Sequence, residues 1–512
     1  MLAAGAFLPS LWAGFVADDF VLLRTVRRYG GLFWALTRND RGQSGDAGHF
    51  YRPFWVAWNG SIYDLVGAHA FVFHAGNLLL FVVATLEVWV LARRLLPAQA
   101  AFVAAAGFAV YPRHGETVSW ISGNTDLAAA VPALAAVLVA LAPGRPVARA
   151  LTTGALAGIA AASKEVAFAV PALLVVCWAT LPTDERRRLS RPVGVAVGAM
   201  VVADAAVLVA RVVVIGGSGG YGNYGFGPEH VAGTAATYVI AVLTPPTVQL
   251  FRYPELLALP LVAVAVAVWA ALRRPESRRV TLAGVAWFVL AALPSLSLAI
   301  DLNSGNGERL LFLPSAGLAL SFGALAPRRG IAVAAAAVVA LGLCLYSAWN
   351  WVPAGRLARD VARQTAAIGP RDGEVVLLSV PATYRNAQVF PGGELNAALA
   401  YYGREDLTSA FCAPIQLRHR KPDEVAFTPA IGGYAGHSSW SAAFDVPVLH
   451  GVEPLGGDCS YARLDPDRWP PGLTRSVVVT PRPSRPHAVL VYFDGDRLRP
   501  VESAQAAGTP HG

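Results

Sequence analysis

Long apolar runs alternate with short polar stretches along the chain up to about residue 352. A transmembrane helix needs about 20 mostly apolar residues, and apolar residues at a 3.6-residue period indicate an amphipathic helix. On this basis we predict about eleven membrane spans, several of them short. They cover residues 1–17, 71–92, 98–111, 127–142, 149–163, 166–181, 193–215, 255–272, 280–300, 310–326 and 330–350.

The pattern changes after residue 352, where many prolines and charged clusters interrupt the chain. Residues 375–379, 476–479 and 488–493 are short runs of the kind that form strands. We therefore predict two domains. Residues 1–352 form an all-α, polytopic membrane domain, and residues 353–512 form a separate α+β domain exposed to water.

The composition agrees with a membrane protein. Hydrophobic residues make up 55% of the 512 residues and charged residues only 14%, whereas a soluble domain carries about 25% charged residues. Soluble, disordered and coiled-coil classes are therefore excluded. The net charge of +8 is almost entirely arginine. These arginines lie in short loops between spans, so they report topology and do not indicate nucleic-acid binding.

The arginines also predict the orientation. One set of loops is rich in arginine, for example at Arg93–Arg94 and Arg186–Arg188, and the alternate loops 112–126, 216–230 and 301–309 are poor in it. The positive-inside rule places the first set in the cytoplasm and the second set outside, together with the C-terminal domain. Because the loops must alternate between the two faces in this way, residues 231–250 cannot cross the membrane fully and are predicted to be interfacial or re-entrant. The arginine-rich style of the chain suggests the inner membrane of a bacterium.

The first external loop, residues 18–70, begins with two candidate chemical groups. Its segments 18–36 and 55–66 have the amphipathic pattern of helices that lie in the membrane interface. Asp18 and Asp19 follow the first predicted span directly. They could supply a general base with an orienting partner, or they could simply cap the following helix. The residues alone leave both interpretations open.

Further charged residues lie at the ends of spans, where charge is expensive and indicates function by default. Arg52 could bind a phosphate, or it could be an arginine that reaches to the interface. Lys164-Glu165 and Glu308-Arg309 could be structural ion pairs, or they could share an anionic ligand. The loop 111–126 adds further polar groups of the predicted substrate site, namely Arg113, His114 and Glu116.

Metal and disulfide chemistry are weakly represented. His114 and Glu116 form an HxE pair, but no further ligands stand at metal spacing, so no metal site is assigned and a divalent metal stays unsupported. Cys177 and Cys344 lie in apolar runs. Cys412 and Cys459 lie in the tail and could form a disulfide worth roughly 3–4 kcal/mol if the tail is extracytoplasmic.

Several segments together resemble the membrane half of the transmembrane and tetratricopeptide-repeat O-mannosyltransferases and, more loosely, the protein O-mannosyltransferase group of GT-C glycosyltransferases. They occur in the family order over about residues 15–325. The segments are Asp18-Asp19, Tyr51-Arg52-Pro53-Phe54, His74-Ala75-Gly76-Asn77-Leu78-Leu79, Tyr111 to Glu116 with Trp120 to Gly123, Ser163-Lys164-Glu165, and Glu308 to Ser315. Two features depart from the family: Tyr111 replaces the usual histidine, and the tail shows no helical repeat.

The resemblance implies a polyprenyl-phosphate-linked sugar as donor, mannose first, and a hydroxyl of a protein or glycan as acceptor on the external face. Asp19 or Asp18 would be the base, and Arg52, Lys164 and Arg309 would stabilise the phosphate leaving group. Arg113, His114, Glu116, Glu165 and Glu308 would complete the site, and by family likeness the transfer would invert the anomeric carbon. Two alternatives remain: a flippase for lipid-linked sugars, and a cell-envelope assembly protein without catalysis.

Overall fold

The structure is a computed structural model. It describes the chain except for residues 30–32, 42–49, 218–226, 245–261, most positions between 263 and 274, 303, 327–329, 418–424, 430–439, 445–458, 464–475, 482, 486–487 and 502–512. Two compact units divide the chain. The helical unit contains Met1–Trp12 and Thr25–Trp349, and the C-terminal unit contains Ala13–Arg24 and Asn350–Gly512. Asp18 and Asp19 therefore belong to the C-terminal unit, outside the predicted domain boundaries of 353–512.

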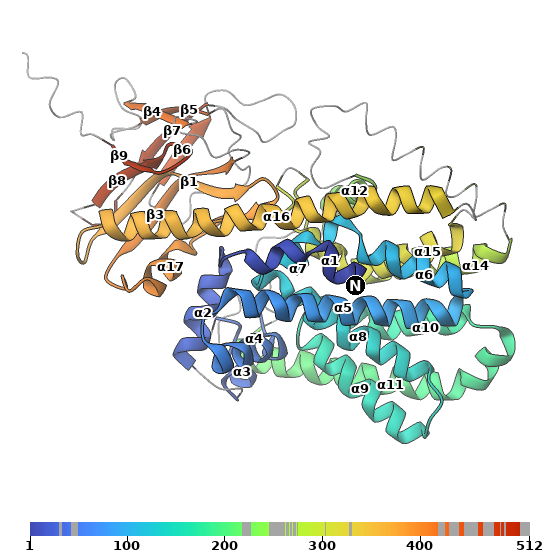
Figure 1. The fold of residues 1–512 in the computed structure, drawn as a ribbon. Helices are drawn as coiled ribbons and strands as arrows, with labels where there is room; N and C mark the ends of the chain where they lie inside the picture. The colour runs from blue at the N-terminus through green and yellow to red at the C-terminus, as the bar shows by residue number, and fades with distance from the viewer. Residues whose placement is uncertain are drawn as a thin grey trace, which may run out of the picture. The chain divides into compact units, whose positions relative to one another are not determined.

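Helices build the first unit, and most follow the predicted apolar runs (Figure 1). The helices before the central bundle are α1 (Leu2–Ala6), η1 (Leu8–Trp12), α2 (Asp18–Tyr29), which passes from one unit to the other, α3 (Phe33–Thr37) and α4 (Pro53–Val66). The bundle itself contains α5 (Ala70–Leu95), α6 (Ala98–Ala109), η2 (Pro112–His114), α7 (Gly115–Ser119), η3 (Ser122–Asn124), α8 (Thr125–Leu141), α9 (Pro146–Ala161), η4 (Glu165–Ala169), α10 (Val170–Thr180) and α11 (Thr183–Ile215). It continues with α12 (Pro228–Leu243), α14 (Pro275–Ala292), η7 (Leu293–Ser295), η8 (Glu308–Leu311), α15 (Phe312–Leu325) and α16 (Gly330–Ile368).

The chain is an integral, multi-pass membrane protein. Five helical stretches in the described part are long and apolar enough to cross a bilayer, and two shorter apolar helices, Ala98–Ala109 and Glu165–Thr180, accompany them. The five are Ala70–Leu95, Ser122–Leu141, Thr183–Ile215, Glu308–Leu325 and Val333–Ile368. The predicted total of eleven spans stays a prediction, because span 255–272 lies almost wholly outside the described residues.

Two predicted spans differ from the structure. The first, residues 1–17, is not one helix, because α1 ends at Ala6 and the short η1 ends at Trp12. The last, residues 330–350, continues without interruption to Ile368. Hydropathy detects the end of the apolar run, but Leu357, Val361 and Thr365 stay buried at four-residue spacing and keep the helix amphipathic. The segment 231–250, predicted to be interfacial, begins inside α12.

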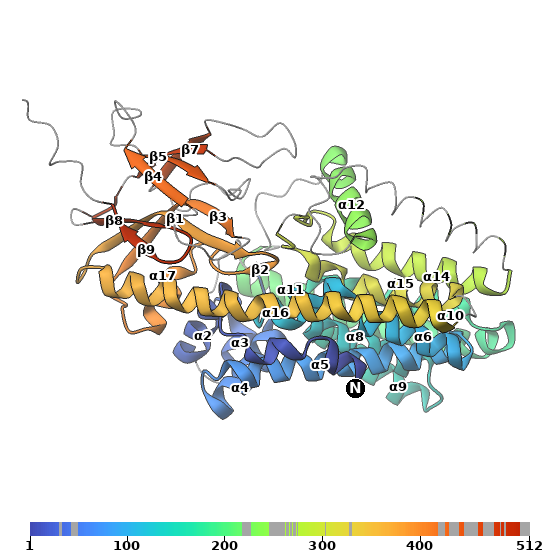
Figure 2. The same cartoon turned by 45° about the horizontal axis from the view of Figure 1, so that its top comes forward.

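Small residues let the helices of the first unit approach closely. The turned view in Figure 2 shows α14 beside α15. A Cβ atom built on Gly284 would stand 2.3 Å from the carbonyl oxygen of Gly317, so neither position has room for a side chain. Close contact between small residues is a main source of helix association in membranes. The buried rings of Phe7, Phe81 and Phe108 lie in the core beside them.

Strands dominate the C-terminal unit, as predicted for the tail. In the first sheet, β1 (Glu374–Tyr384) pairs parallel with β3 (Thr408–Leu417) and β8 (Ala488–Phe493), and antiparallel with β2 (Ala387–Gln388), while β9 (Leu498–Pro500) pairs with β8. Helix α17 (Leu395–Tyr401) precedes β3. An antiparallel sheet follows, in the order β4 (Val425–Pro429), β5 (Trp440–Phe444), β7 (Ser476–Pro481), β6 (Cys459–Arg463).

Candidate active site

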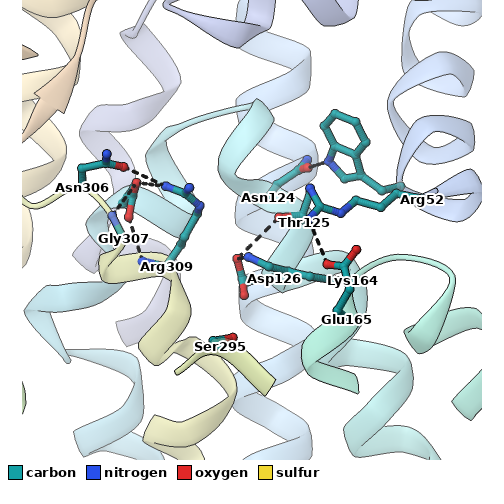
Figure 3. Close-up of polar contacts among 12 residues, drawn as sticks. Arg52, Asn124, Thr125, Asp126, Lys164, Glu165, Ser295, Asn306, Gly307 and Arg309 are labelled. Carbon is teal, nitrogen blue, oxygen red and sulfur yellow. Dashed lines mark hydrogen bonds and ion pairs between the residues drawn. The ribbon is translucent and has the colours of Figure 1, made fainter. Parts of the chain in front are cut away.

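The two neighbouring charges Lys164 and Glu165 do not pair with each other. Lys164, which precedes η4, forms an ion pair with Asp126 in the first turn of α8. Glu165 accepts from Arg52 at 2.9 Å (Figure 3). It also accepts from Arg211 of α11 at 2.6 Å. Of the two interpretations left open by the sequence, a structural ion pair between Lys164 and Glu165 is not what the structure shows. Lys164 has an extended backbone before the turn, with φ −163°, so the two adjacent side chains take different directions.

Glu308 and Arg309 also bind across to another segment. Arg113 of η2 forms a buried ion pair with Glu308, and it donates to the carbonyl oxygen and the hydroxyl of Thr244, both at 2.9 Å. Arg309 pairs with Glu116 of α7. Glu116 also accepts from the backbone amide of Arg309 at 2.8 Å. Instead of pairing with each other, which was one of the two interpretations left open, Glu308 and Arg309 form two pairs that join the 111–126 loop to η8.

These paired side chains are gathered on facing helix ends. Figure 3 shows Arg309 with Asn306 on one side, the Asp126–Lys164 pair in the middle and Arg52 with Glu165 on the other side. Burial lowers the pKa of the Lys164 ammonium, Asp126 opposes this shift, and the positive charges of Arg309 and Arg52 add to it. The three cations are therefore close enough to affect one another. An anion would relieve their repulsion.

Buried cations and carboxylates are paired throughout this cluster. The cations are Arg52, Arg113, Lys164, Arg211 and Arg309, and their carboxylate partners are Glu116, Asp126, Glu165 and Glu308. Each cation is oriented by a carboxylate, and Glu165 is shared by Arg52 and Arg211. The side chains of Arg52 and Arg309 are 11% and 17% exposed, so a ligand can reach both. The arrangement suits a bound phosphate.

His114 lies in an aromatic pocket. Its Nε2 is 2.8 Å from the hydroxyl of Ser315, and its ring lies 4.7 Å from the ring centroids of both Phe108 and Phe312. Burial lowers the pKa of His114 to about 3, so the imidazole is neutral at physiological pH. Among the residues that the structure describes, no group of three His, Cys, Asp or Glu side chains could hold a metal.

A buried amide network supports the cluster, and the sequence analysis did not single it out. The side-chain oxygen of Asn124 accepts from the indole of Trp55 at 2.5 Å, and its amide donates to Asn77 at 2.7 Å. Asn77 and Asn124 are fully buried. Two charged members, Asp126 and Arg211, were also passed over. Asp126 directly precedes one predicted span, and Arg211 lies within another. A lone charge at such a position is costly in a membrane and could have indicated a functional residue.

Asp18 and Asp19, in the C-terminal unit, differ in exposure. Asp19 is fully buried, and its carboxylate accepts from the backbone amide of Val16 at 3.0 Å. Asp18 is partly exposed at the start of α2. The residue before it, Ala17, is buried with φ +45°, in the left-handed region that favours glycine. Asp19 therefore joins the start of α2 to the residues that precede it. The catalytic and capping roles of Asp18 and Asp19 stay predictions.

The cysteines of the described part fall into two groups. Cys177 and Cys344 are buried free thiols. Cys412 of β3 is disulfide-bonded, as expected of one member of the candidate pair. Cys459 lies on β6, but its side chain falls outside the described ones. The pairing of Cys412 with Cys459 stays a prediction.

Comparison with known proteins supports the resemblance. The family model of dolichyl-phosphate-mannose-protein mannosyltransferases matches residues 51–210, which include Arg52, Arg113, Glu116 and Lys164. The chain is 33% identical over 144 residues to the protein O-mannosyl-transferase Tmtc1 of Drosophila melanogaster and 37% identical over 142 residues to Tmtc2 of the same fly. These matches confirm the predicted resemblance and support the class of glycosyltransferases.

Only part of each protein is matched. The alignments cover 25% of this chain and 16% and 15% of the two fly proteins, so the chain spans about one sixth of the length of these relatives. Among solved structures, ArnT from Cupriavidus metallidurans bound to undecaprenyl phosphate is 15% identical at a TM-score of 0.44, and covers 78% of this chain and 83% of that chain. The archaeal oligosaccharyltransferase AglB from Archaeoglobus fulgidus is 12% identical at a TM-score of 0.38. This match covers 72% of this chain and 58% of that chain. No assignment rests on these two likenesses.

Proposed function

We propose that the protein is a membrane glycosyltransferase that transfers a sugar, mannose first, from a polyprenyl-phosphate donor to a hydroxyl of a protein or glycan acceptor. One observation carries this proposal. Within and beside the family-matched residues 51–210, buried cations and carboxylates converge on one set of helix ends, and Arg52 and Arg309 there are partly exposed. A donor anchored in the membrane explains why such a cluster is built between apolar helices.

The chemistry of the leaving group explains the cations. When the bond from the anomeric carbon to the phosphate breaks, the polyprenyl phosphate gains negative charge. Positive groups that are already held in place stabilise this charge without reorganising. Lys164, Arg309 and Arg52 have this role in the proposal. Their partners Asp126, Glu116 and Glu165 orient them, and Arg113 with Glu308 supports the 111–116 segment.

The acceptor hydroxyl needs a base, and we assign this role to Asp18. Its carboxylate is partly exposed, whereas the carboxylate of Asp19 is buried and engaged by the amide of Val16. A base must come within hydrogen-bond distance of the proton that it takes. Asp19 is thus a positioning residue that holds the start of α2, where Asp18 lies.

The orientation follows from the loop charges. The arginine-rich loops predict that the 112–126 and 301–309 segments face outside. Glu116 and Arg309 of the cluster lie in these segments, so the proposed transfer takes place on the external face. We place the protein in a bacterial inner membrane with the C-terminal unit outside, where a disulfide at Cys412 would persist.

The test uses purified protein in nanodiscs with polyprenyl-phosphate mannose as the probe. Sugar release or transfer and donor binding are measured for wild type, Asp18→Asn and Lys164→Met. Asp184→Asn is the matched control, because Asp184 is an exposed carboxylate in the first turn of another helix, α11. We expect Asp18→Asn to lose turnover and keep donor binding, Lys164→Met to weaken donor binding, and Asp184→Asn to behave as wild type.

Two results would contradict the proposal. Full turnover in Asp18→Asn would remove the assigned base. Movement of the lipid-linked sugar across a vesicle bilayer, with no transfer in any variant, would favour a flippase.

A further inference from the structure

An apolar cavity lies in the helical unit and reaches Tyr111 and Pro112, next to the Arg113–Glu308 pair. It has a volume of about 290 Å³ and is enclosed by α6, α15 and the first turns of α16. Its size approaches that of small-molecule pockets, which are about 300–1,000 Å³. Small residues create the space, among them Gly107, Ala319 and Ala337.

The cavity is elongated along the helices. Its wall runs from Ser315 to Phe322 on α15 and from Val333 to Ala340 on α16. Each stretch is two helical turns, or about 10 Å at 1.5 Å per residue. Apart from Tyr111 and Ser315 at one end, the lining side chains carry no polar atom. A flexible hydrocarbon chain matches this shape and polarity better than a compact polar molecule.

One end of the cavity offers a hydrogen-bond donor. The hydroxyl of Tyr111 is buried and has no hydrogen-bond partner among the described residues. Burial raises the pKa of this phenol, so it keeps its proton. The neighbouring hydroxyl of Ser315 already donates to the carbonyl of Phe312 at 2.6 Å and contacts His114. A buried polar group nearly always has a hydrogen-bond partner, so we expect the hydroxyl of Tyr111 to donate a hydrogen bond to a bound molecule.

The cavity reaches the outer surface of the helical unit between α15 and α16. Two of its lining residues, Phe322 of α15 and Ala336 of α16, are exposed at the outer surface of the helices. Around them Val338 and Val339 are about two-thirds exposed. In a membrane protein such surfaces contact lipid chains, so a chain enters the cavity without crossing water.

We propose that this cavity binds one hydrocarbon chain of a bilayer phospholipid, whose ester carbonyl accepts a hydrogen bond from Tyr111. A neutral acceptor fits better than the phosphate of the sugar donor. The nearest cation, Arg113, is already paired with Glu308 and bonded to Thr244. The site is thus separate from the donor cluster, and the bound chain fills the space between α6, α15 and α16 beside His114.

The experiment measures bound lipid and not activity, so its failure is distinct from failure of the proposed glycosyl transfer. The protein is delipidated in detergent, and phosphatidylethanolamine is added back. Native mass spectrometry then counts retained lipid, and thermal unfolding records stabilisation. Ala337→Trp fills the cavity, and Ala340→Leu fills it in part if the larger change impairs folding. Ala335→Trp is the matched control, because Ala335 is exposed on the same helix outside the cavity.

We expect wild type and Ala335→Trp to retain about one phospholipid per chain, Ala337→Trp and Ala340→Leu to lose it, and Tyr111→Phe to bind it several-fold more weakly. Equal retention in the filled and control variants would overturn the proposal. Absence of retained lipid and of thermal stabilisation in wild type would do the same. Preferential retention of polyprenyl phosphate would show that the cavity holds the donor's tail and would equally refute the assignment.

Discussion

Two buried ion pairs of the helical unit differ from the Arg404–Asp406 pair of the C-terminal unit in exposure and in sequence separation. In the helical unit, Arg113–Glu308 and Arg309–Glu116 join residues 195 and 193 positions apart. The side chains of the first pair are 3% and 1% exposed. In the C-terminal unit, Arg404 and Asp406 are two positions apart, and their side chains are 22% and 30% exposed. The first two pairs thus join distant parts of the sequence, whereas the Arg404–Asp406 pair is local and solvated.

This difference predicts different consequences of mutation. Removing one partner of a buried ion pair leaves a charge without compensation and costs about 3–5 kcal/mol, whereas exposed pairs contribute about 0–1 kcal/mol. The pairs of the helical unit also tie separate helices together, so their loss disturbs the site as well as the stability. Two substitutions test this contrast directly, and two others test a buried imidazole of the helical unit and a strained backbone position of the C-terminal unit. They follow from the largest expected effect to the smallest.

The largest effect is expected for Glu116→Ala. Its carboxylate is 1% exposed, pairs with Arg309, and accepts from the backbone amides of Arg309 and Gly307 at 2.8 and 3.3 Å. The substitution removes the carboxylate partner of Arg309, which still donates to Asn306 at 3.2 Å, and it takes the acceptor from two buried backbone amides. We expect a loss of about 3–5 kcal/mol in the free energy of unfolding, measured by denaturant titration in detergent.

The double variant Glu116→Ala with Arg309→Leu supplies the control. If the stranded charge causes the loss, removing Arg309 as well restores part of the stability. An unchanged midpoint for Glu116→Ala alone would mean that the pair is solvated, and the contrast between the units would fail.

His114 predicts a pH effect of intermediate size. Its folded pKa of about 3 lies below its ordinary value of 6.5 because burial disfavours the charged form. Between these values the unfolded chain binds more protons, so stability falls as the pH drops below 6.5. His114 adds at most about 1.4 kcal/mol per pH unit to the slope of the free energy of unfolding against pH. His114→Gln removes it, as unfolding curves at pH 7.5, 6.0 and 5.0 would show.

The exposed imidazole of His230 offers the comparison for that experiment. His230→Gln keeps the slope of wild type if burial is the cause. A slope that survives in His114→Gln would assign the pH dependence to other groups.

The sequence predicted the helices better than the pairs. Apolar runs identified α5, α8, α11 and α15 because burial in a bilayer demands about 20 apolar residues whatever their partners. Pairing depends on which helix ends meet, and the adjacency of Lys164 to Glu165 carried no information about that. Arg211 lies inside the predicted span 193–215, and its pairing with Glu165 was not predicted, although a lone charge within a span indicates a functional residue.

The boundary of the C-terminal unit was harder still. Residues 13–24 join a unit whose other members begin at Asn350. No local pattern encodes a contact over such a separation, and the apolar character of residues 1–17 instead suggested one span. The carboxylates of Asp18 and Asp19 were predicted as a pair, but their unequal exposure came only from the fold.

A smaller effect of opposite sign is expected for Ala17→Gly. Ala17 is buried with φ +45°, where a Cβ atom is strained. Glycine relieves this strain and stabilises the C-terminal unit by about 1 kcal/mol, read as a rise of a few degrees in Tm. Ala13→Gly is the matched control, because Ala13 is buried in the same segment without positive φ. It is expected to lower Tm, and a fall in both variants would argue against strain at Ala17.

The smallest effect is expected for Asp406→Asn, the counterpart of Glu116→Ala in the C-terminal unit. The side-chain hydrogen bond from Arg404 lowers the pKa of Asp406 to about 2, from an ordinary 3.8. Its stabilisation is therefore present above pH 3.8 and lost as the pH falls toward 2. Solvent screens this exposed pair, and Arg404 also donates to the carbonyls of Gly369 and Pro370 at 3.1 and 3.0 Å, so it keeps partners after the substitution. We expect Tm at pH 7 to stay within about 1 °C of wild type, since surface substitutions usually change stability very little. A loss comparable to that of Glu116→Ala would show that short sequence separation and exposure do not distinguish the pairs of the two units.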